Sequence, residues 1–137
     1  MSRETIEARC DAIEECYEFL LAYAAQGLTS DAGTESGSQV REFLRSAVNA
    51  LTGLAEACAA AFAGEGQAFL SVVDRDARDS LAAVELVLAQ PAISSQLIDN
   101  LNASIHLRAL LTDLFLVGEI LNKQHKPAGH AVTSESK

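Results

Sequence analysis

The sequence predicts an all-α protein, an up-down antiparallel four-helix bundle, on three observations. Apolar residues recur at alternating spacings of three and four in four long stretches, as expected for helices with one buried face. Hydrophobic residues make up 49% of the 137 positions, whereas aromatic residues make up 5% and tryptophan is absent, which favours helix over sheet. Segments containing glycine or proline separate these stretches. We therefore expect one domain over residues 1–124, followed by a disordered tail over residues 125–137.

The first helix is expected over about residues 4–26. Ser2 can cap its N-terminus, and Gly27 can end it because glycine readily adopts the backbone conformation found after a helix. The polar segment 29–37 has no residue able to build a core, so we expect it to be the most mobile connection. The expected core face of this helix consists of Ile6, Cys10, Ile13, Tyr17, Leu20 and Ala24.

The second and third helices are expected over about residues 38–63 and 67–89. Ser38 is the expected N-cap of the second helix. Gly64 and Gly66 allow the chain to reverse over a short turn, so the two helices should be antiparallel neighbours. Their expected core faces consist of Val40, Leu44, Val48, Leu51, Ala55, Cys58 and Phe62, and of Leu70, Val73, Ala77, Leu81, Val84 and Leu88.

A fourth helix is expected to begin between Pro91 and Ser95 and to continue to about Lys123. Proline disfavours helix at the residue before it, so we expect a turn at Pro91; a kinked, continuous helix is the alternative. This helix carries apolar residues on two faces. We expect the first face to fill the core, and it consists of Ile98, Ile105, Ala109, Leu116 and Ile120.

The second apolar face of the fourth helix is the predicted contact with a second subunit, because an additional apolar face needs an additional partner. The alternative is that the helix is the central, mostly buried helix of a monomer. The predicted contact residues are Leu107, Leu110, Leu114, Phe115, Val117 and Leu121.

Charge and cysteine content limit the partners and the compartment. A formal net charge of −9 would repel nucleic-acid phosphates and anionic lipid headgroups, so neither nucleic acid nor a membrane surface is an expected partner. No uninterrupted apolar run reaches membrane-spanning length. The three cysteines are an odd number and lie in helical segments, so we expect reduced thiols and a cytoplasmic protein.

A narrow polar stripe on the fourth helix is the best candidate for a ligand-binding site. It gathers Asp99, Asn102, His106 and Asp113 between the two apolar faces. Within it, His106 could serve as a proton acceptor, a metal ligand or a phosphoacceptor; the alternative is an ordinary, partly exposed histidine.

A pair of cysteines is the second candidate for such a site. Antiparallel packing of the first two helices would place Cys10 about one helical turn from Cys58. The alternative is that both thiols pack as small buried hydrophobic groups. The two Glu-x-x-His pairs of a di-iron bundle are absent, and we expect neither a metal nor a cofactor.

The chain contains no nucleophile-base-acid set and no phosphate-cradling glycine loop, so a non-enzymatic role is favoured. We expect an interaction protein, an accessory or regulatory subunit that forms a homodimer through its fourth helix and can bind another protein. The alternative is a bundle that binds a small ligand or a metal, with His106 and the core cysteines as polar anchors.

Overall fold

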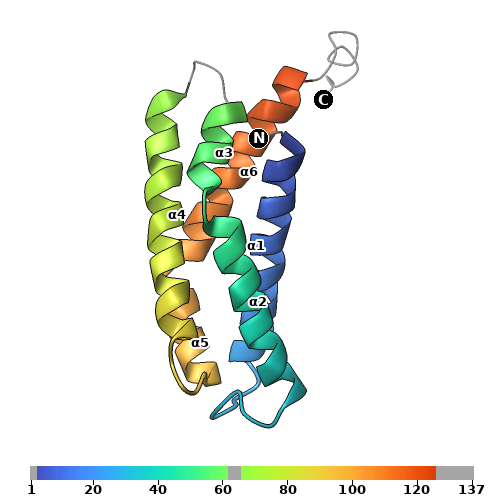
Figure 1. Cartoon of the computed structure of the whole chain (residues 1–137), viewed down its shortest axis with the longest axis vertical. Coiled ribbons are helices and arrows are strands. Elements are labelled where there is room, and N and C mark those ends of the chain that lie inside the picture. The colour runs from blue at the N-terminus through green and yellow to red at the C-terminus, as the bar shows by residue number, and fades with distance from the viewer. Residues whose placement is uncertain (1–2, 62–65, 126–137) are drawn as a thin grey trace.

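The computed structural model describes residues 3–61 and 66–125, and Figure 1 shows their arrangement. Within these ranges the chain forms six helices and no strand, which confirms the all-α class. The predicted tail, apart from His125, lies outside the described residues, as does Ser2. The helices are α1 (Arg3–Ala24), α2 (Glu35–Leu51), α3 (Leu54–Ala61), α4 (Gln67–Leu88), α5 (Ser95–Ala103) and α6 (His106–His125).

The long helices lie side by side (Figure 1). The first of them, α1, packs against α2, α3, α5 and α6, and α4 packs against α2, α3, α5 and α6. The core between them is almost entirely aliphatic, with Tyr23 as its largest fully buried side chain. The apolar stripes of α1, α2 and α4 meet there, as the periodicity of the sequence predicts.

The prediction of four continuous helices is not confirmed, because the second and fourth expected helices are each divided in two. The first break falls at Thr52 and Gly53, where Gly53 adopts a positive φ of 78° that ends a helix. Across this break, Arg9 of α1 donates to the carbonyl oxygens of Ala50 and Thr52 at 2.9 and 2.6 Å. The C-terminal carbonyls of α2 therefore have a charged partner on a neighbouring helix.

The second break lies between α5 and α6, at Ser104 and Ile105. The Oγ of Ser104 donates to the carbonyl oxygen of Leu101 at 2.6 Å, within the last turn of α5. Ile105 adopts a positive φ of 63°, the one non-glycine residue in the described chain to do so. The left-handed conformation is costly for a β-branched residue. The start of α6 at His106 is therefore set by the surrounding packing and not by local preference.

Several helix boundaries agree with the sequence prediction. Gly27 has a positive φ of 70° just beyond α1, and α4 ends one residue before its expected end. Pro91 lies in a turn between two helices, so the turn is confirmed and the continuous kinked helix is wrong. Ser94, in the predicted interval, caps α5 by accepting a hydrogen bond from the backbone N–H of Leu97 at 3.0 Å.

The predicted cap of the second helix is wrong. Thr34 is the N-cap of α2, and its Oγ1 accepts a hydrogen bond from the backbone N–H of Gly37 at 2.9 Å. The helix therefore begins at Glu35, before Ser38. Gly37 is buried against Asp31, and a Cβ at this position would overlap the Asp31 carbonyl. The close contact between the loop and the first turn of α2 thus requires glycine.

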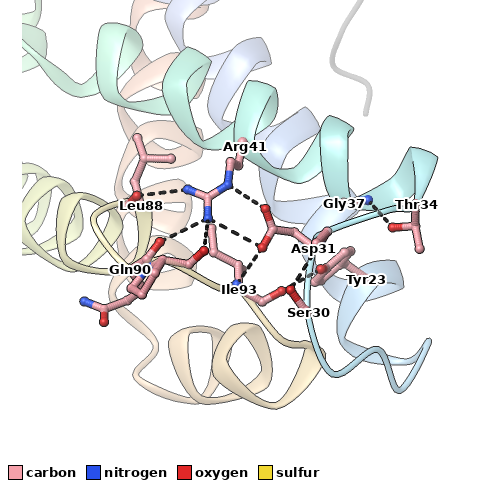
Figure 2. A network of polar contacts seen from close by, with 11 residues as sticks. Tyr23, Ser30, Asp31, Thr34, Gly37, Arg41, Leu88, Gln90 and Ile93 are labelled. Atoms are coloured by element: carbon pink, nitrogen blue, oxygen red, sulfur yellow. Dashed lines mark hydrogen bonds and ion pairs between the residues drawn. The ribbon is translucent and has the colours of Figure 1, made fainter.

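Arg41 joins the loop after α1 to the end of α4 (Figure 2). Its Nε donates to Oδ2 of Asp31 at 2.6 Å, its Nη1 to the carbonyl oxygen of Leu88 at 3.2 Å, and its Nη2 to that of Gln90 at 3.0 Å. Asp31 in turn accepts from the backbone N–H of Ile93 at 2.8 Å. The segment predicted to be the most mobile is therefore held by an ion pair and by backbone contacts on both sides.

A second group of hydrogen bonds secures the same end of the molecule. The hydroxyl of buried Tyr23 donates to the carbonyl oxygen of Ile93 at 2.7 Å. Ser95 Oγ donates to the carbonyl oxygen of Tyr23 at 2.6 Å and accepts from the backbone N–H of Leu28 at 2.9 Å. The backbone N–H of Ser95 returns a bond to the Leu28 carbonyl at 2.8 Å. Together these bonds join the end of α1 to the start of α5.

Candidate functional site

The predicted contact face of the fourth helix needs correction, because most of it lies in the core of the single chain. Four of its residues have exposed fractions of 4% or less, and Leu121 has a side chain outside the described set. The buried residues cannot reach a second subunit while the chain stays folded. Among the predicted contact residues with described side chains, Phe115, at 52% exposure, is the one found on the surface. The four buried residues are Leu107, Leu110, Leu114 and Val117.

The exposed surface of α6 instead has a stripe of four residues at spacings of four, three and four. We call this the α6 stripe, and it consists of Arg108, Thr112, Phe115 and Glu119, all of which are exposed. These spacings place the four side chains on one face of the helix, opposite its buried leucines. Two further apolar residues flank the stripe: Leu116, with 50% exposure, and Ile120, with 37%. The expected core face of this helix is therefore partly on the surface.

A groove of about 380 Å³ lies between α1 and α6, beside the α6 stripe. Its apolar lining comes from Ile6 and Cys10 of α1 and from Leu114 and Phe115 of α6. Gly118 also lines the groove and leaves open space, since a Cβ added there would meet no atom within 4 Å. The groove therefore combines an apolar surface with a gap between side chains. Its acidic lining consists of Glu7, Asp11, Glu14 and Glu119.

The predicted polar stripe is divided between two places in the structure. Asp99 and Asn102 line a pocket of about 370 Å³ between α1 and α5. Asn102 Nδ2 donates to the carbonyl oxygen of Leu20 at 3.3 Å. His106 is half-buried at the first position of α6, and Asp113 faces α4. The break at Ile105 is the physical reason for the division, because it interrupts the helical phase that would have aligned the four residues.

Asp113 forms a carboxyl pair with Asp76 of α4. Its exposed fraction is 9%, and its Oδ2 is buried without a hydrogen-bond partner among the described residues. Burial, together with a hydrogen bond to the Asp76 carboxyl and repulsion from it, raises the pKa of Asp113 from 3.8 to about 7. One turn further along α4, the buried Ser80 Oγ also has no partner within the described ranges.

The sequence predicts Asp113 as a candidate site residue but does not predict its partner. In the helical projection of α4, Asp76 falls with charged residues on the side away from the core stripe. The one local indication that Asp76 lies near the core is that the next residue, Ala77, is buried. The pairing of Asp76 with Asp113 depends on how α4 and α6 pack against each other. The sequence of either helix alone does not determine that packing.

The three cysteines are free thiols, with Cys10 half-buried and Cys16 and Cys58 buried. Burial, with added repulsion from Glu14 and Asp11, raises the pKa of Cys10 to about 11. Cys58 is near enough to contribute to the same shift. A thiol with this pKa is protonated at neutral pH and is a weak nucleophile. Packing therefore accounts for the positions of these cysteines better than redox chemistry does.

The described part of the chain contains no group of three or more His, Cys, Asp and Glu side chains placed to hold a metal ion. Among its helices, none is long and apolar enough to cross a membrane.

Comparison with known proteins leaves the chain without an assigned family. No protein-family model matches it, and neither the curated proteins nor the solved structures contain a significant match.

Proposed function

We propose that this chain is a helical interaction protein that forms a homodimer through the outer surface of α6. The observation that supports this proposal is the α6 stripe, which is complementary to itself when two copies pack antiparallel. A two-fold axis level with the midpoint between residues 113 and 114 would place Arg108 opposite Glu119 of the second copy. The same operation places Thr112 opposite Phe115 of the second copy. Each end of the contact then has an ion pair, and its middle pairs the apolar Phe115 ring with Thr112.

The flanking apolar residues favour the same arrangement. In an antiparallel pair related by this axis, the two Leu116 side chains lie on the same edge of the contact. Each copy could then cover part of a side chain that is 50% exposed in the single chain. Spacings of four and three along the stripe are those of helices that pack with a small crossing angle.

The proposed dimer is weak and concentration-dependent. A contact made by one helix face buries less than the roughly 1,600 Å² of a standard stable interface. A net charge of −9 on each copy also opposes association, although salt screens this repulsion beyond about 8 Å at physiological ionic strength. Such a dimer suits a regulatory or accessory subunit whose assembly depends on its concentration.

Two finer features of the sequence prediction are retained within this proposal. We infer that α2 together with α3, and α5 together with α6, each take the place of one continuous helix of a four-helix bundle. With α1 and α4 they would follow an up-down order (Figure 1). We also infer a cytoplasmic location, supported by the three free cysteines.

Light scattering coupled to size exclusion, over a range of concentrations, tests the proposed dimer. We expect a wild-type mass that rises toward the dimer, and a monomer for Arg108→Glu, which would place two carboxylates opposite each other at both ends. The double variant Arg108→Glu with Glu119→Arg should restore the dimer, because it exchanges the two charges. Arg75→Glu, on the exposed surface of α4, is the matched control and should leave the mass unchanged.

The result that would contradict the proposal is a wild type that stays monomeric at the highest concentration. An Arg108→Glu variant that dimerises as well as the wild type would also contradict it. Phe115→Glu provides an independent variant at the centre of the stripe, and because Phe115 is exposed, this change should preserve the fold.

A further inference from the structure

We propose that the groove between α1 and α6 binds an amphipathic helix of another protein, one that carries basic side chains beside a short apolar stripe. The groove lies between two packed helices, and its apolar lining includes the exposed Phe115 and the half-buried Cys10. Grooves of this kind commonly receive the apolar face of a partner helix.

The charge around the groove identifies the kind of partner. Among the described side chains, four carboxylates line it and no lysine or arginine does. Arg9, in the same stretch of α1, is directed elsewhere, because its guanidinium donates to the carbonyls of Ala50 and Thr52 at the break after α2. The carboxylates of Glu7, Asp11 and Glu14 therefore have no basic neighbour among the described side chains that line the groove. Basic residues on a partner helix would complement them.

The length of the groove fits a short helical segment. From Ile6 to Glu14 the α1 wall spans nine residues, and the eight helical rises between them correspond to about 12 Å. This distance covers roughly two turns of a partner, enough for apolar anchors at positions i, i+4 and i+7. A volume of about 380 Å³ suits a few anchoring side chains and not a whole helix.

Gly118 gives an observation independent of charge. It lies inside α6, where glycine costs up to about 1 kcal/mol relative to alanine. Nothing in the described part of the chain requires glycine there, because an added Cβ meets no atom within 4 Å and Gly118 is not among the glycines with a positive φ. A partner that approaches the backbone of α6 at this position would explain the missing side chain.

The proposed partner is not a second copy of this chain. Every copy carries a net charge of −9, and the carboxylates on the α1 wall would repel an acidic helix. Phe115 and Glu119 belong to both the groove and the α6 stripe, so the variants that test the groove are placed on α1 and at Gly118. Failure of one proposal can then be distinguished from failure of the other.

Fluorescence anisotropy of the full chain with a labelled peptide tests the groove. The probe is a peptide of about 18 residues with leucines at i, i+4 and i+7 and lysines beside them, long enough to form a helix. We expect saturable binding that weakens as salt is added. The triple variant Glu7→Lys, Asp11→Lys and Glu14→Lys should weaken binding by at least about tenfold. Gly118→Leu, which fills the groove from α6, should cause a similar loss.

Matched controls separate the groove from the overall charge. The triple variant Glu42→Lys, Asp79→Lys and Glu85→Lys makes the same change in net charge at exposed positions of α2 and α4, and it should bind nearly as well as the wild type. A peptide with the lysines replaced by glutamates, and one with the leucines scrambled, should not bind. Arg108→Glu should still bind the peptide, because it disrupts only the proposed dimer. Circular dichroism establishes that each variant is folded.

Several results would overturn the proposal. They include a wild type that does not bind the peptide, a control triple variant that loses as much affinity as the groove triple, and a folded Gly118→Leu variant with wild-type affinity. Equal binding of the peptide with scrambled leucines would show that binding is non-specific and does not depend on the groove. If the α1 variants change the oligomeric state and no peptide binds, a second copy is the occupant of the groove and the proposal is wrong.

Discussion

Replacing Asp113 with asparagine should stabilise the protein at pH 8 and have little effect near pH 4. In the folded chain the carboxyl of Asp113 is buried against Asp76, and its pKa is raised from 3.8 to about 7. A raised pKa means that folding favours the protonated form. The contribution of this group to stability is therefore complete below 3.8 and is lost as the pH rises to about 7. Asparagine resembles the neutral acid and avoids this loss.

The size of the effect follows from the same pKa. One pKa unit corresponds to about 1.4 kcal/mol, so a change from 3.8 to about 7 corresponds to at most about 4 kcal/mol. Because Asp76 shares the interaction and water can reach the exposed edge of the pair, we expect a gain of about 2 to 3 kcal/mol at pH 8. Urea unfolding followed by circular dichroism, at several pH values from 4 to 8, measures this gain for Asp113→Asn.

Asp76→Asn is the matched variant, because it removes the repulsion from the other side of the pair. It should also stabilise the chain at pH 8, and the double variant should gain less than the sum of the two single variants. The reasoning would be refuted by an Asp113→Asn variant that is no more stable than the wild type at pH 8. A gain that is the same at pH 4 and pH 8 would refute it as well.

Four further changes test the other structural inferences by the same unfolding measurement. Arg41→Ala should destabilise the fold by about 3 kcal/mol at neutral pH, because it leaves the half-buried Asp31 carboxylate without its cationic partner. Arg41 lowers the pKa of Asp31, so this loss should shrink as the pH falls below 3.8; a loss that does not depend on pH would exclude the ion pair as its cause. Gly37→Ala should cost more than about 2 kcal/mol, because its Cβ would overlap the Asp31 carbonyl, whereas Gly118→Ala should stabilise the chain slightly. Ile105→Asn should raise stability by about 1 kcal/mol by relieving the positive φ, and an unchanged or lower stability would show that the break does not hold this strain.

The parts of the fold that local chemistry determines could be predicted from the sequence. The helical class follows from the apolar periodicity, and the end of α1 follows from Gly27. The turn at Pro91 follows from the geometry that proline imposes on its neighbours. In each case the deciding interaction lies within a few residues of the signal, so a single stretch of sequence contains it.

The hydrogen bonds that join the loop after α1 to the end of α4 could not be predicted, because they connect segments that are distant in the sequence. Arg41 binds the nearby Asp31 and also the backbone carbonyls of Leu88 and Gln90. Every residue has a backbone carbonyl, so the sequence does not indicate which carbonyls Arg41 will bind. The capping role of Thr34 was missed for a related reason, since Ser38 is an equally good capping residue by type. In the structure α2 already begins at Glu35, and Gly37 in its first turn lies against the Asp31 carbonyl.

The reversed assignment of the two faces of the fourth helix follows from the break at Ile105. A continuous helix would carry the phase of buried Ile98 through Ile105 to Leu116 and so place Leu116 in the core. In the structure the left-handed residue ends that phase, and α6 begins a new one in which Leu107 and Leu110 point inward. The interruption therefore leaves Leu116 and Ile120, which were expected in the core, at the surface. The proposed dimer would use the surface that this new phase of α6 turns outward.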